Sequence, residues 1–595
     1  MQHKACLHKY CLSKTKQKYI IETSENKLVS FIKENIMDYK KLADLLYPNV
    51  TKTIDDYLKQ YPKRKLSAEQ EVARIAPSPT GYLHIGHLSS ALLSKSLVLG
   101  TDGIFYLRLE DTDQKREIEN AGTIAYDILC RFGLTPDEGY CGDNKPQKGN
   151  YGDYIQSHRL EIYNTFAKHL VSIGKAFPCF CEKSEGKEDV LARRSEQLES
   201  GDAIEEKDPC RDLTLEEVEQ KLAAGKPWAL RLKATGNPDK TFRFKDRIKG
   251  DREIRENNKD IVLVKSNGIP PYSFAHIVDD TLMGTTTVVR GEEWYPSLAG
   301  HLEIFDAFGF KAPKYAHTPV ICKIDEATGN KRKLSKRKDP EADVRYFLQM
   351  GYPTESVLEY LMNLLNSDFE NWRAQNPLLP YTEFRFSVEK IGSNNPMFDM
   401  VKLEDGSKNI ISHYSPEKIA DHVLAWAQEF DNEFYDIVKD RRDYLVGLFS
   451  IDRIDTPKPR KDIAKWADVK TLYAYMFEEL TKLDTLADFD FADNVSNEDK
   501  IAVLEAYAKI YDQNDDKQQW FDKIKSLCEP LGFSADMKAY KKNPEAFKGS
   551  VADVSGIIRV ALTGRRMTPD LYFVKKLLGR DKVIERLNKA IALLK

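Results

Sequence analysis

Two short apolar runs on either side of a helix-like segment constrain this chain more than any other feature. Residues 72–76 read VARIA, and residues 104–109 read IFYLRL. Between them lie turn residues at 77–81 (PSPTG) and a helical pattern that begins near 84. Strands joined by a crossover helix run parallel in one sheet. The sequence therefore predicts a βαβ unit inside a larger α/β domain.

The rest of the chain divides into segments with different patterns of apolar and charged residues. A chain of 595 residues is too long for one core. Residues 179–257 are charged and are predicted to be irregular, whereas 260–265 and 286–290 read as further strands. From about 346 to 595 apolar residues recur at helical spacing. We therefore expect a multidomain fold of α/β plus all-α type.

Composition excludes several classes of protein. Apolar residues make up 41% and charged residues 31%, with a net charge of −3, as in ordinary globular proteins. No run of about 18 apolar residues predicts a membrane span. The first residues lack the apolar core of a secretory signal. Nine cysteines, an odd number, favour a reducing compartment, so we expect a cytoplasmic protein with no membrane partner. Met1 and Met37 remain alternative starts.

A pair of histidines opens the predicted helix. His84 and His87 are three residues apart and share the first helical turn, where the helix dipole favours phosphate. Gly86 lies between them, and its missing Cβ lets a base or ribose approach the backbone. These residues are predicted to face a nucleotide.

A lysine-rich segment lies some 245 residues further on, at KRKLSKRK (331–338). Lys333 and Lys336 are suited to neutralise charge that builds up as pyrophosphate leaves. Gly329 and Pro340 flank the segment and favour a mobile loop. Each motif alone is weak, but the pair is specific.

Together the two motifs resemble the signatures of class I aminoacyl-tRNA synthetases. The flanking words resemble the glutamyl-tRNA synthetase family of bacterial type, over about residues 38–595. They are RIAPSPTGYLHIGH (74–87), LRLEDTD (107–113), VDDTLMG (278–284), VVRGEEW (288–294) and KRKLSKRKD (331–339).

The resemblance implies an order of domains. An N-terminal, partly helical extension (1–70) precedes an interrupted Rossmann-like catalytic domain. The catalytic parts are 71–178 and 271–311, with an acceptor-stem insertion at 179–270. A stem-contact region with the KLSKR loop (312–410) and an α-helical anticodon-binding domain (411–595) follow. Aromatic residues in that last domain are expected to be core, and no base contact is assigned.

The resemblance also implies an activity: ATP, as its Mg²⁺ complex, and L-glutamate form a glutamyl-adenylate, from which glutamate passes to the 3′ end of tRNA(Glu). Family members generally bind tRNA before activation and are often monomers. The implied glutamate-binding residues are Arg74, Ser78, Glu110, Tyr272 and Arg290, and the implied ATP-binding residues are His84, Gly86, His87, Glu293, Lys333 and Lys336. Among these, His84, His87, Lys333 and Lys336 carry the catalytic charge stabilisation. Trp294 is expected to pack beside the pocket, and His276 is given no catalytic step.

A split set of cysteines indicates a metal site. Cys179 and Cys181, with Cys210 and Asp212, offer four donors of the kind that structural zinc requires. Relatives carry Cys-x-Cys and Cys-x-His here, so Asp212 would replace a histidine. The alternative is three free thiols in a loop.

Three alternatives for function stay open. A non-discriminating enzyme would also charge tRNA(Gln), a choice that lies in unplaced anticodon contacts. A tRNA-modifying paralogue would lack the roughly 190 residues after position 400. A non-catalytic tRNA-binding protein would not need both intact motifs.

Overall fold

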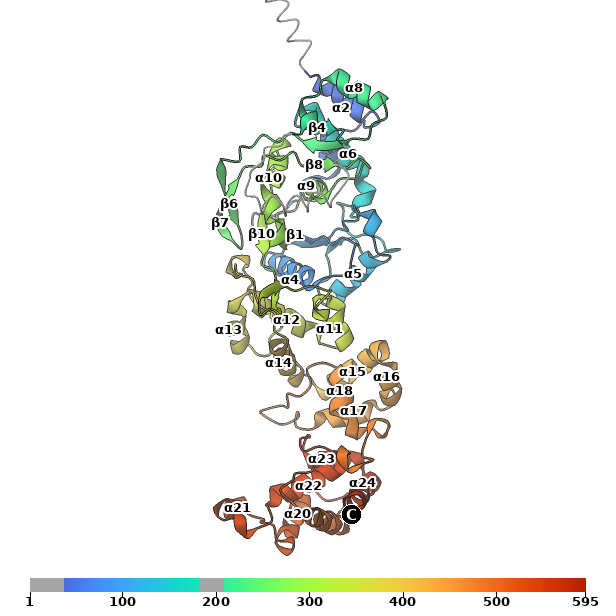
Figure 1. Cartoon of the computed structure of the whole chain (residues 1–595), viewed down its shortest axis with the longest axis vertical. Helices are drawn as coiled ribbons and strands as arrows, with labels where there is room; N and C mark the ends of the chain where they lie inside the picture. Colours follow the sequence, from blue (N-terminus) through green and yellow to red (C-terminus); the bar gives the residue numbers. More distant parts are fainter. Residues whose placement is uncertain (1–36, 182–207) are drawn as a thin grey trace, which may run out of the picture. The chain divides into compact units, whose positions relative to one another are not determined.

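The computed structural model describes residues 37–181 and 208–595, and the chain forms two compact units (Figure 1). The first contains the described residues up to Val344, with Leu365–Ala374 and Pro380–Met397. The second contains Arg345–Leu364, Gln375–Leu379 and Phe398–Lys595. Each unit has its own apolar core.

The predicted βαβ unit is confirmed in the first unit. Strand β1 (Val72–Ile75) leads into helix α4 (Ile85–Leu99) and then into β2 (Ile104–Leu107). The two strands pair in parallel, with Arg74 opposite Tyr106, and β2 pairs in parallel with the short β3 (Glu138–Gly139). All four residues of β1 are buried, as expected of a strand covered on both faces.

A second parallel pair adjoins the first. Strands β9 (Thr287–Gly291) and β10 (Lys314–Thr318) pair with Arg290 opposite His317. The amide of Thr286 donates to the carbonyl of Val72 at 3.0 Å, which joins the start of β9 to the start of β1. Helices α9 (Tyr272–Leu282) and α10 (Leu298–Ala307) flank β9 in sequence. The carboxyl ends of β1 and β9 therefore lie at the same edge of the interrupted α/β domain.

The expectation of irregular structure at 179–257 was wrong for the described residues 208–257. Strands β4 (Ala176–Cys179), β5 (Ala229–Leu232) and β8 (Val262–Val264) form an antiparallel sheet, with α8 (Leu215–Ala223) between β4 and β5. Strands β6 (Thr241–Asp246) and β7 (Gly250–Arg255) form a hairpin, labelled in Figure 1, in which Phe244 packs on Tyr315 of β10. Alternation of Phe with Arg and Lys in TFRFKD was the missed signal, because high charge masked its period of two.

The N-terminal segment is part of the first unit from residue 37 onward. Helices α2 (Tyr39–Leu46) and α3 (Ile54–Gln60) pack on α6 (Leu160–Ser172) and bury Leu42, Leu46 and Tyr57 in the same core. The remainder of the predicted extension, residues 1–36, lies outside the described residues. The first unit also contains α5 (Ala121–Arg131), β11 (Cys322–Ile324), β12 (Lys331–Lys333) and α13 (Ser367–Gln375) in whole or in large part.

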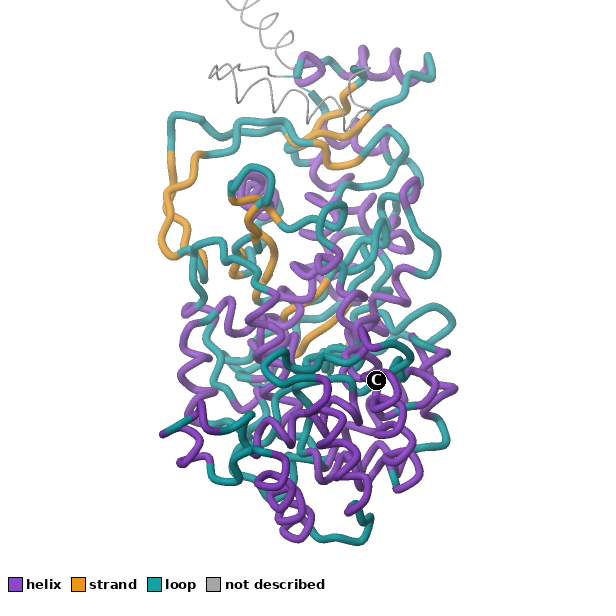
Figure 2. Tube along the Cα trace, turned by 60° about the horizontal axis from the view of Figure 1, so that its bottom comes forward, coloured by secondary structure: helices purple, strands orange, loops and turns teal. Residues whose placement is uncertain are grey.

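The second unit consists of helices and turns, as expected (Figure 2). Trp426, Trp466, Tyr473, Tyr475 and Trp520 lie in its core, which confirms that these aromatic residues are structural. No described helix is both long and apolar enough to span a membrane. The helices that begin near or after the boundary are α11 (Val344–Met350), α12 (Thr354–Leu365), α14 (Met400–Ser412), α15 (Pro416–Phe430), α16 (Asn432–Val438), α17 (Arg442–Ser450), α18 (Ala467–Leu472), α19 (Asn497–Ile510), α20 (Lys517–Leu531), α21 (Met537–Lys542), α22 (Val551–Thr563), α23 (Leu571–Leu578) and α24 (Arg580–Leu594).

A partly buried ion pair between Arg64 and Glu138 fastens the N-terminal segment, and its loss gives a testable prediction. Arg64 donates to both carboxylate oxygens of Glu138, at 2.9 and 2.7 Å, and to the carbonyl of Met283. Arg64→Ala leaves Glu138 with Tyr154 as a hydrogen-bond donor but without a cation, and it should cost about 1.5–3 kcal/mol of unfolding free energy, measured by denaturant unfolding. Lys52→Ala, which removes an exposed pair with Glu161, is the control and should leave the midpoint unchanged. Equal midpoints for the two variants would contradict this role.

Candidate active site and metal centre

The histidine pair forms the N-terminal cap of α4. His84 Nδ1 accepts from the Gly86 amide at 3.1 Å, and His87 Nδ1 accepts from the His84 amide at 3.3 Å. Both rings therefore carry their proton on Nε2. His84 donates that proton to the carbonyl of Leu334 at 3.2 Å. Burial lowers the pKa of His84, and the nearby Lys336 and Lys333 add to this effect. The helix start thus presents the Nε2–H of His87 beside a positive dipole, while His84 ties the helix start to the lysine segment.

The lysine segment is held against this cap. Strand β12 pairs with β11, and the next residue, Leu334, is fully buried. Arg332 donates to both carboxylate oxygens of Asp339, and Lys336 Nζ donates to the carbonyl of Tyr82. Lys333 Nζ lies 3.5 Å from a carboxylate oxygen of Glu293. Both lysines are therefore placed next to the N-terminus of α4, and the mobility of the segment stays a prediction.

One cavity of about 440 Å³ collects the residues that were predicted to bind glutamate and ATP. It lies at the carboxyl ends of β1 and β9, where open parallel sheets bind ligands. Trp294 lines it too, 4.2 Å from the Tyr272 ring between centroids. A Cβ on Gly86 would meet only His84 Nδ1 at 3.5 Å, so the fold itself does not demand glycine there. All eleven line the cavity: Arg74, Ser78, His84, Gly86, His87, Glu110, Tyr272, Arg290, Glu293, Lys333 and Lys336.

A buried charge network supports one side of the cavity. Asp280 on α9 accepts from Arg74 Nε at 3.3 Å and from Arg108 Nη1 at 2.8 Å. Burial raises the pKa of Asp280, but the two guanidinium groups outweigh it and hold that pKa well below its ordinary range. Arg108 also donates to Glu110 at 2.9 Å. Burial raises the pKa of Glu110, and Arg108 and Arg74 oppose this only in part. Arg74 and Glu110 are thus fixed before any ligand arrives.

The second arginine has different partners. Arg290 Nε donates to His317 Nε2 at 3.0 Å, and Nη1 lies 3.2 Å from both Tyr272 Oη and His301 Nδ1. The guanidinium lies 4.7 Å from the centroid of the Tyr315 ring. Its Nη2 atom is buried and has no acceptor among the described residues. Arg290 is therefore positioned by neutral groups.

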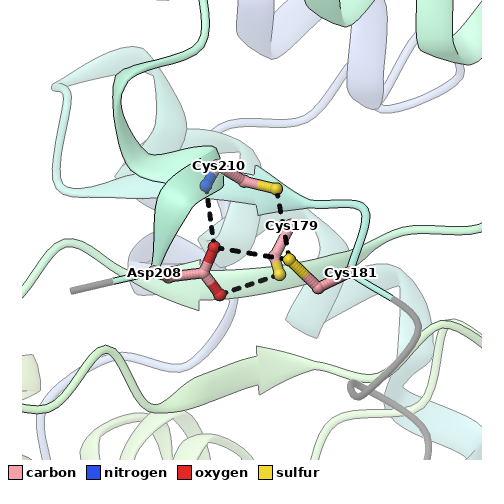
Figure 3. A group of neighbouring side chains, drawn as sticks. All are labelled: Cys179, Cys181, Asp208 and Cys210. Carbon is pink, nitrogen blue, oxygen red and sulfur yellow. Dashed lines mark hydrogen bonds between the residues drawn. The ribbon is translucent and has the colours of Figure 1, made fainter. Parts of the chain in front are cut away.

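A separate cluster of three thiols and one carboxylate lies beside β4 (Figure 3). The donor atoms of Cys179, Cys181, Cys210 and Asp208 all lie within 4.8 Å of one another. Cys179 Sγ donates to Asp208 at 2.9 Å, and the Cys181 and Cys210 sulfurs are 3.6 Å apart. Three sulfurs and one oxygen match the donors and the number of ligands in a closed zinc site. These residues could hold a metal ion.

The fourth predicted ligand, Asp212, was wrong. Its side chain is 90% exposed and lies 3.8 Å from Lys233, outside the cluster. Cys210 and Asp212 belong to one short 3₁₀ turn, Pro209–Asp212, which Asp208 caps by accepting from the Cys210 amide at 2.9 Å. Asp208, the residue before the turn, therefore faces the three thiols. Burial and the bond to Asp208 raise the pKa of Cys179 to about 12, and burial raises that of Cys210.

Comparison with known proteins agrees with this geometry. Residues 71–389 match the family described as tRNA synthetases class I (E and Q), catalytic domain, and residues 418–591 match an anticodon binding domain. A glutamate–tRNA ligase of Clostridium perfringens is 44% identical over 557 residues, covering 94% of this chain and 100% of the relative. One from Acetivibrio thermocellus is 44% identical over 93% of this chain and all of the relative.

The chain belongs to the glutamate–tRNA ligase family. Solved structures agree on the fold. A glutamate–tRNA synthetase of Elizabethkingia anophelis superposes with a TM-score of 0.67 at 23% identity, covering 88% of this chain and all of that chain. A ligase from Elizabethkingia meningosepticum, solved in complex with its amino acid, gives 0.65 at 23% identity over 89% of this chain.

Sequence reasoning missed the residues behind the ligase pocket. Arg108, Asp280, His301 and His317 are fully or almost fully buried and bind the residues that line the cavity. The signal was present in FAHIVDD (274–280), where a histidine and two aspartates interrupt an apolar helix. Buried carboxylates need cationic partners, so such a run indicates an ion-pair network.

Burial of His276 predicts a pH effect on stability. Burial lowers the pKa of His276 from 6.5 to about 4, although the bond to Asp280 opposes this. Between pH 6.5 and 4 the unfolded chain binds a proton that the folded chain excludes, so stability falls as pH falls. The loss is about 1.4 kcal/mol for each pH unit. His276→Asn should lessen the slope by about 1.4 kcal/mol per pH unit in denaturant unfolding from pH 6.5 to 5, while other buried histidines such as His301 keep the rest of it. The exposed control His413→Asn should keep the full slope. An unchanged slope in His276→Asn would contradict the assignment.

Proposed function

We propose that this chain is a glutamate–tRNA ligase that activates L-glutamate with ATP and transfers it to the 3′ end of tRNA(Glu). Membership of the family supports this proposal, because its class I catalytic domain uses ATP and its curated relatives are glutamate–tRNA ligases. The observation that carries it is the single cavity lined by all eleven predicted residues. Amino acid and nucleotide therefore meet in one place.

The amino acid occupies the buried side of the cavity. Two fixed guanidinium groups, on Arg74 and Arg290, receive the γ-carboxylate, since forked donors match a carboxylate. Glu110 takes the α-ammonium group, and Tyr272 and Ser78 complete the wall. A site that pairs a buried cation with its substrate rejects a neutral analogue, because Arg290 would then stay without a counter-ion.

The nucleotide lies against the N-terminus of α4. The glutamate α-carboxylate attacks the α-phosphorus, forming the acyl–phosphate bond and releasing pyrophosphate. His84, His87, Lys333 and Lys336 stabilise the charge that gathers on the phosphates, and ATP enters as its Mg²⁺ complex. A ribose hydroxyl of tRNA then attacks the acyl carbon, and AMP leaves. No side chain forms a covalent intermediate, so positioning and electrostatics provide the rate.

The tRNA extends beyond the cavity along the remaining domains. The insertion at 179–270 contacts the acceptor stem, the stem-contact region is 312–410, and 411–595 reads the anticodon. The match of 418–591 to an anticodon binding domain supports the last assignment.

Pyrophosphate exchange tests the activity and the lysine role together. Purified protein with tRNA(Glu) should exchange pyrophosphate with ATP only when L-glutamate is added. Lys336→Ala should lower kcat about 10²–10³-fold with little change in the KM for glutamate, as when a donor to developing charge is removed. Lys338→Ala is a control from the same segment, because that lysine pairs with Asp325 and is exposed, and should stay within roughly threefold.

No glutamate-dependent exchange by the unaltered protein would end the proposed activity. Full activity of Lys336→Ala in an active protein would instead remove only the role of that lysine.

We also propose that Cys179, Cys181, Cys210 and Asp208 hold one structural Zn²⁺. Four protein ligands close the coordination shell, so the ion would tie the strand β4 to the turn at 209–212 and take no part in catalysis. We also propose that the protein is cytoplasmic. The seven described cysteines form no disulfide bond with one another, as is usual in a reducing compartment.

Elemental analysis tests the metal and its ligands. Protein purified without chelators should contain one zinc ion per chain, and Asp208→Ala should lose most of it. Asp212→Ala is the matched control and should keep it, because Asp212 lies outside the cluster. Zinc loss in Asp212→Ala with retention in Asp208→Ala would reverse the assignment, and absence of zinc from the unaltered protein would remove it.

A further inference from the structure

We propose that His301 and His317 are positioning residues that hold Arg290 through neutral acceptors, so that its charge stays available to the γ-carboxylate of glutamate. The inference rests on the proposed function and extends it to the basis of selectivity. It assigns a role to two buried histidines that touch neither substrate nor ATP in the mechanism above. Their contacts with Arg290 carry the argument.

The hydrogen bonds fix the protonation of both rings. A guanidinium only donates, so His317 Nε2 and His301 Nδ1 must each present a lone pair to Arg290. An imidazolium has no lone pair, so both rings are neutral. His317 carries its proton on Nδ1 and donates it to Asp246 at 2.6 Å, and His301 carries its proton on Nε2. Burial lowers the pKa of both rings, which keeps them neutral.

Asp246 fixes the tautomer of His317 from behind. Its carboxylate is 1% exposed and also accepts from the amides of Ile248 and Lys249, both at 2.9 Å. Its charge is therefore compensated by backbone donors and by the imidazole, and it has no direct contact with Arg290. The Asp246 carboxylate orients the His317 ring, and that ring in turn orients Arg290.

The other buried arginines nearby are neutralised directly. Arg74 and Arg108 share Asp280, and Arg159 donates to Asp279 at 2.7 Å. Arg290, by contrast, makes no ion pair within the described residues, and its Nη2 atom is buried without an acceptor. A buried cation without a counter-ion is costly, and an anionic ligand removes that cost. This arrangement favours glutamate over its neutral amide.

A carboxylate in place of either His301 or His317 would form an ion pair with Arg290 before glutamate binds. The acceptor atom of His301 is Nδ1, whose place is taken by Oδ1 in both Asn and Asp. The two substitutions have the same shape and differ in charge, so the pair separates charge from packing. Glutamate-dependent pyrophosphate exchange, with tRNA(Glu) present, gives the KM for glutamate, the KM for ATP and the inhibition by L-glutamine.

His301→Asn should keep the KM for glutamate within a few-fold of the unaltered protein. His301→Asp should raise that KM roughly 30-fold or more relative to His301→Asn, without changing the KM for ATP or the inhibition by glutamine. Selectivity for glutamate over glutamine should fall by the same factor. Equal selectivity in the two variants would overturn the inference and reduce His301 to a packing residue. An unaltered protein with no glutamate-dependent exchange would instead overturn the proposed function.

A measurement on the unaltered protein covers the case in which His301→Asp does not fold. Nitrogen NMR of ¹⁵N-histidine-labelled protein at pH 7 should show His301 protonated on Nε2 and His317 protonated on Nδ1, both neutral. A charged ring or the opposite tautomer at either position would contradict the proposal.

Discussion

The ion pairs of Asp280 are the interaction on which the first unit depends. One carboxylate on α9 binds Arg74 from β1 and Arg108, the residue after β2, and so joins the two halves of an interrupted domain. Removing one partner of such a buried set leaves a charge uncompensated, which costs about 3–5 kcal/mol. Arg108 also holds Glu110, so the same network that stabilises the fold positions two walls of the cavity in which we propose that the amino acid binds.

The side of the cavity where we propose that the nucleotide binds is held together by helix capping. Histidine side chains cap α4, and the imidazole of His84 reaches the backbone of Leu334, whose buried side chain anchors the lysine segment. A helix start and a distant hairpin are thereby held together without any ion pair between them. The result is a surface formed by the imidazole of His87, the N-terminus of α4 and the two lysines Lys333 and Lys336, which suits a triphosphate.

The sequence contained most of the site and only part of what supports it. The parallel βαβ unit followed from apolar runs and turn residues, and the eleven pocket residues followed from motifs that resemble a known family. The hairpin β6–β7 was not predicted, because its many charged residues masked the alternation of side chains that is typical of a strand. The fourth residue of the cysteine cluster was predicted wrongly. The spacing within Cys-x-Asp cannot show that a 3₁₀ turn exposes Asp212 and that its cap, Asp208, faces the thiols. Long-range pairs such as Arg290 with His317 depend on strand register, which local patterns do not encode.

A crystal structure with a non-hydrolysable glutamyl-adenylate analogue tests the central claim most directly. The account predicts that the γ-carboxylate bonds to Arg290 Nη2 and to Arg74, that the ammonium group bonds to Glu110, and that the phosphate lies at the N-terminus of α4. A ligand bound with its side-chain carboxylate away from both arginines would contradict the account.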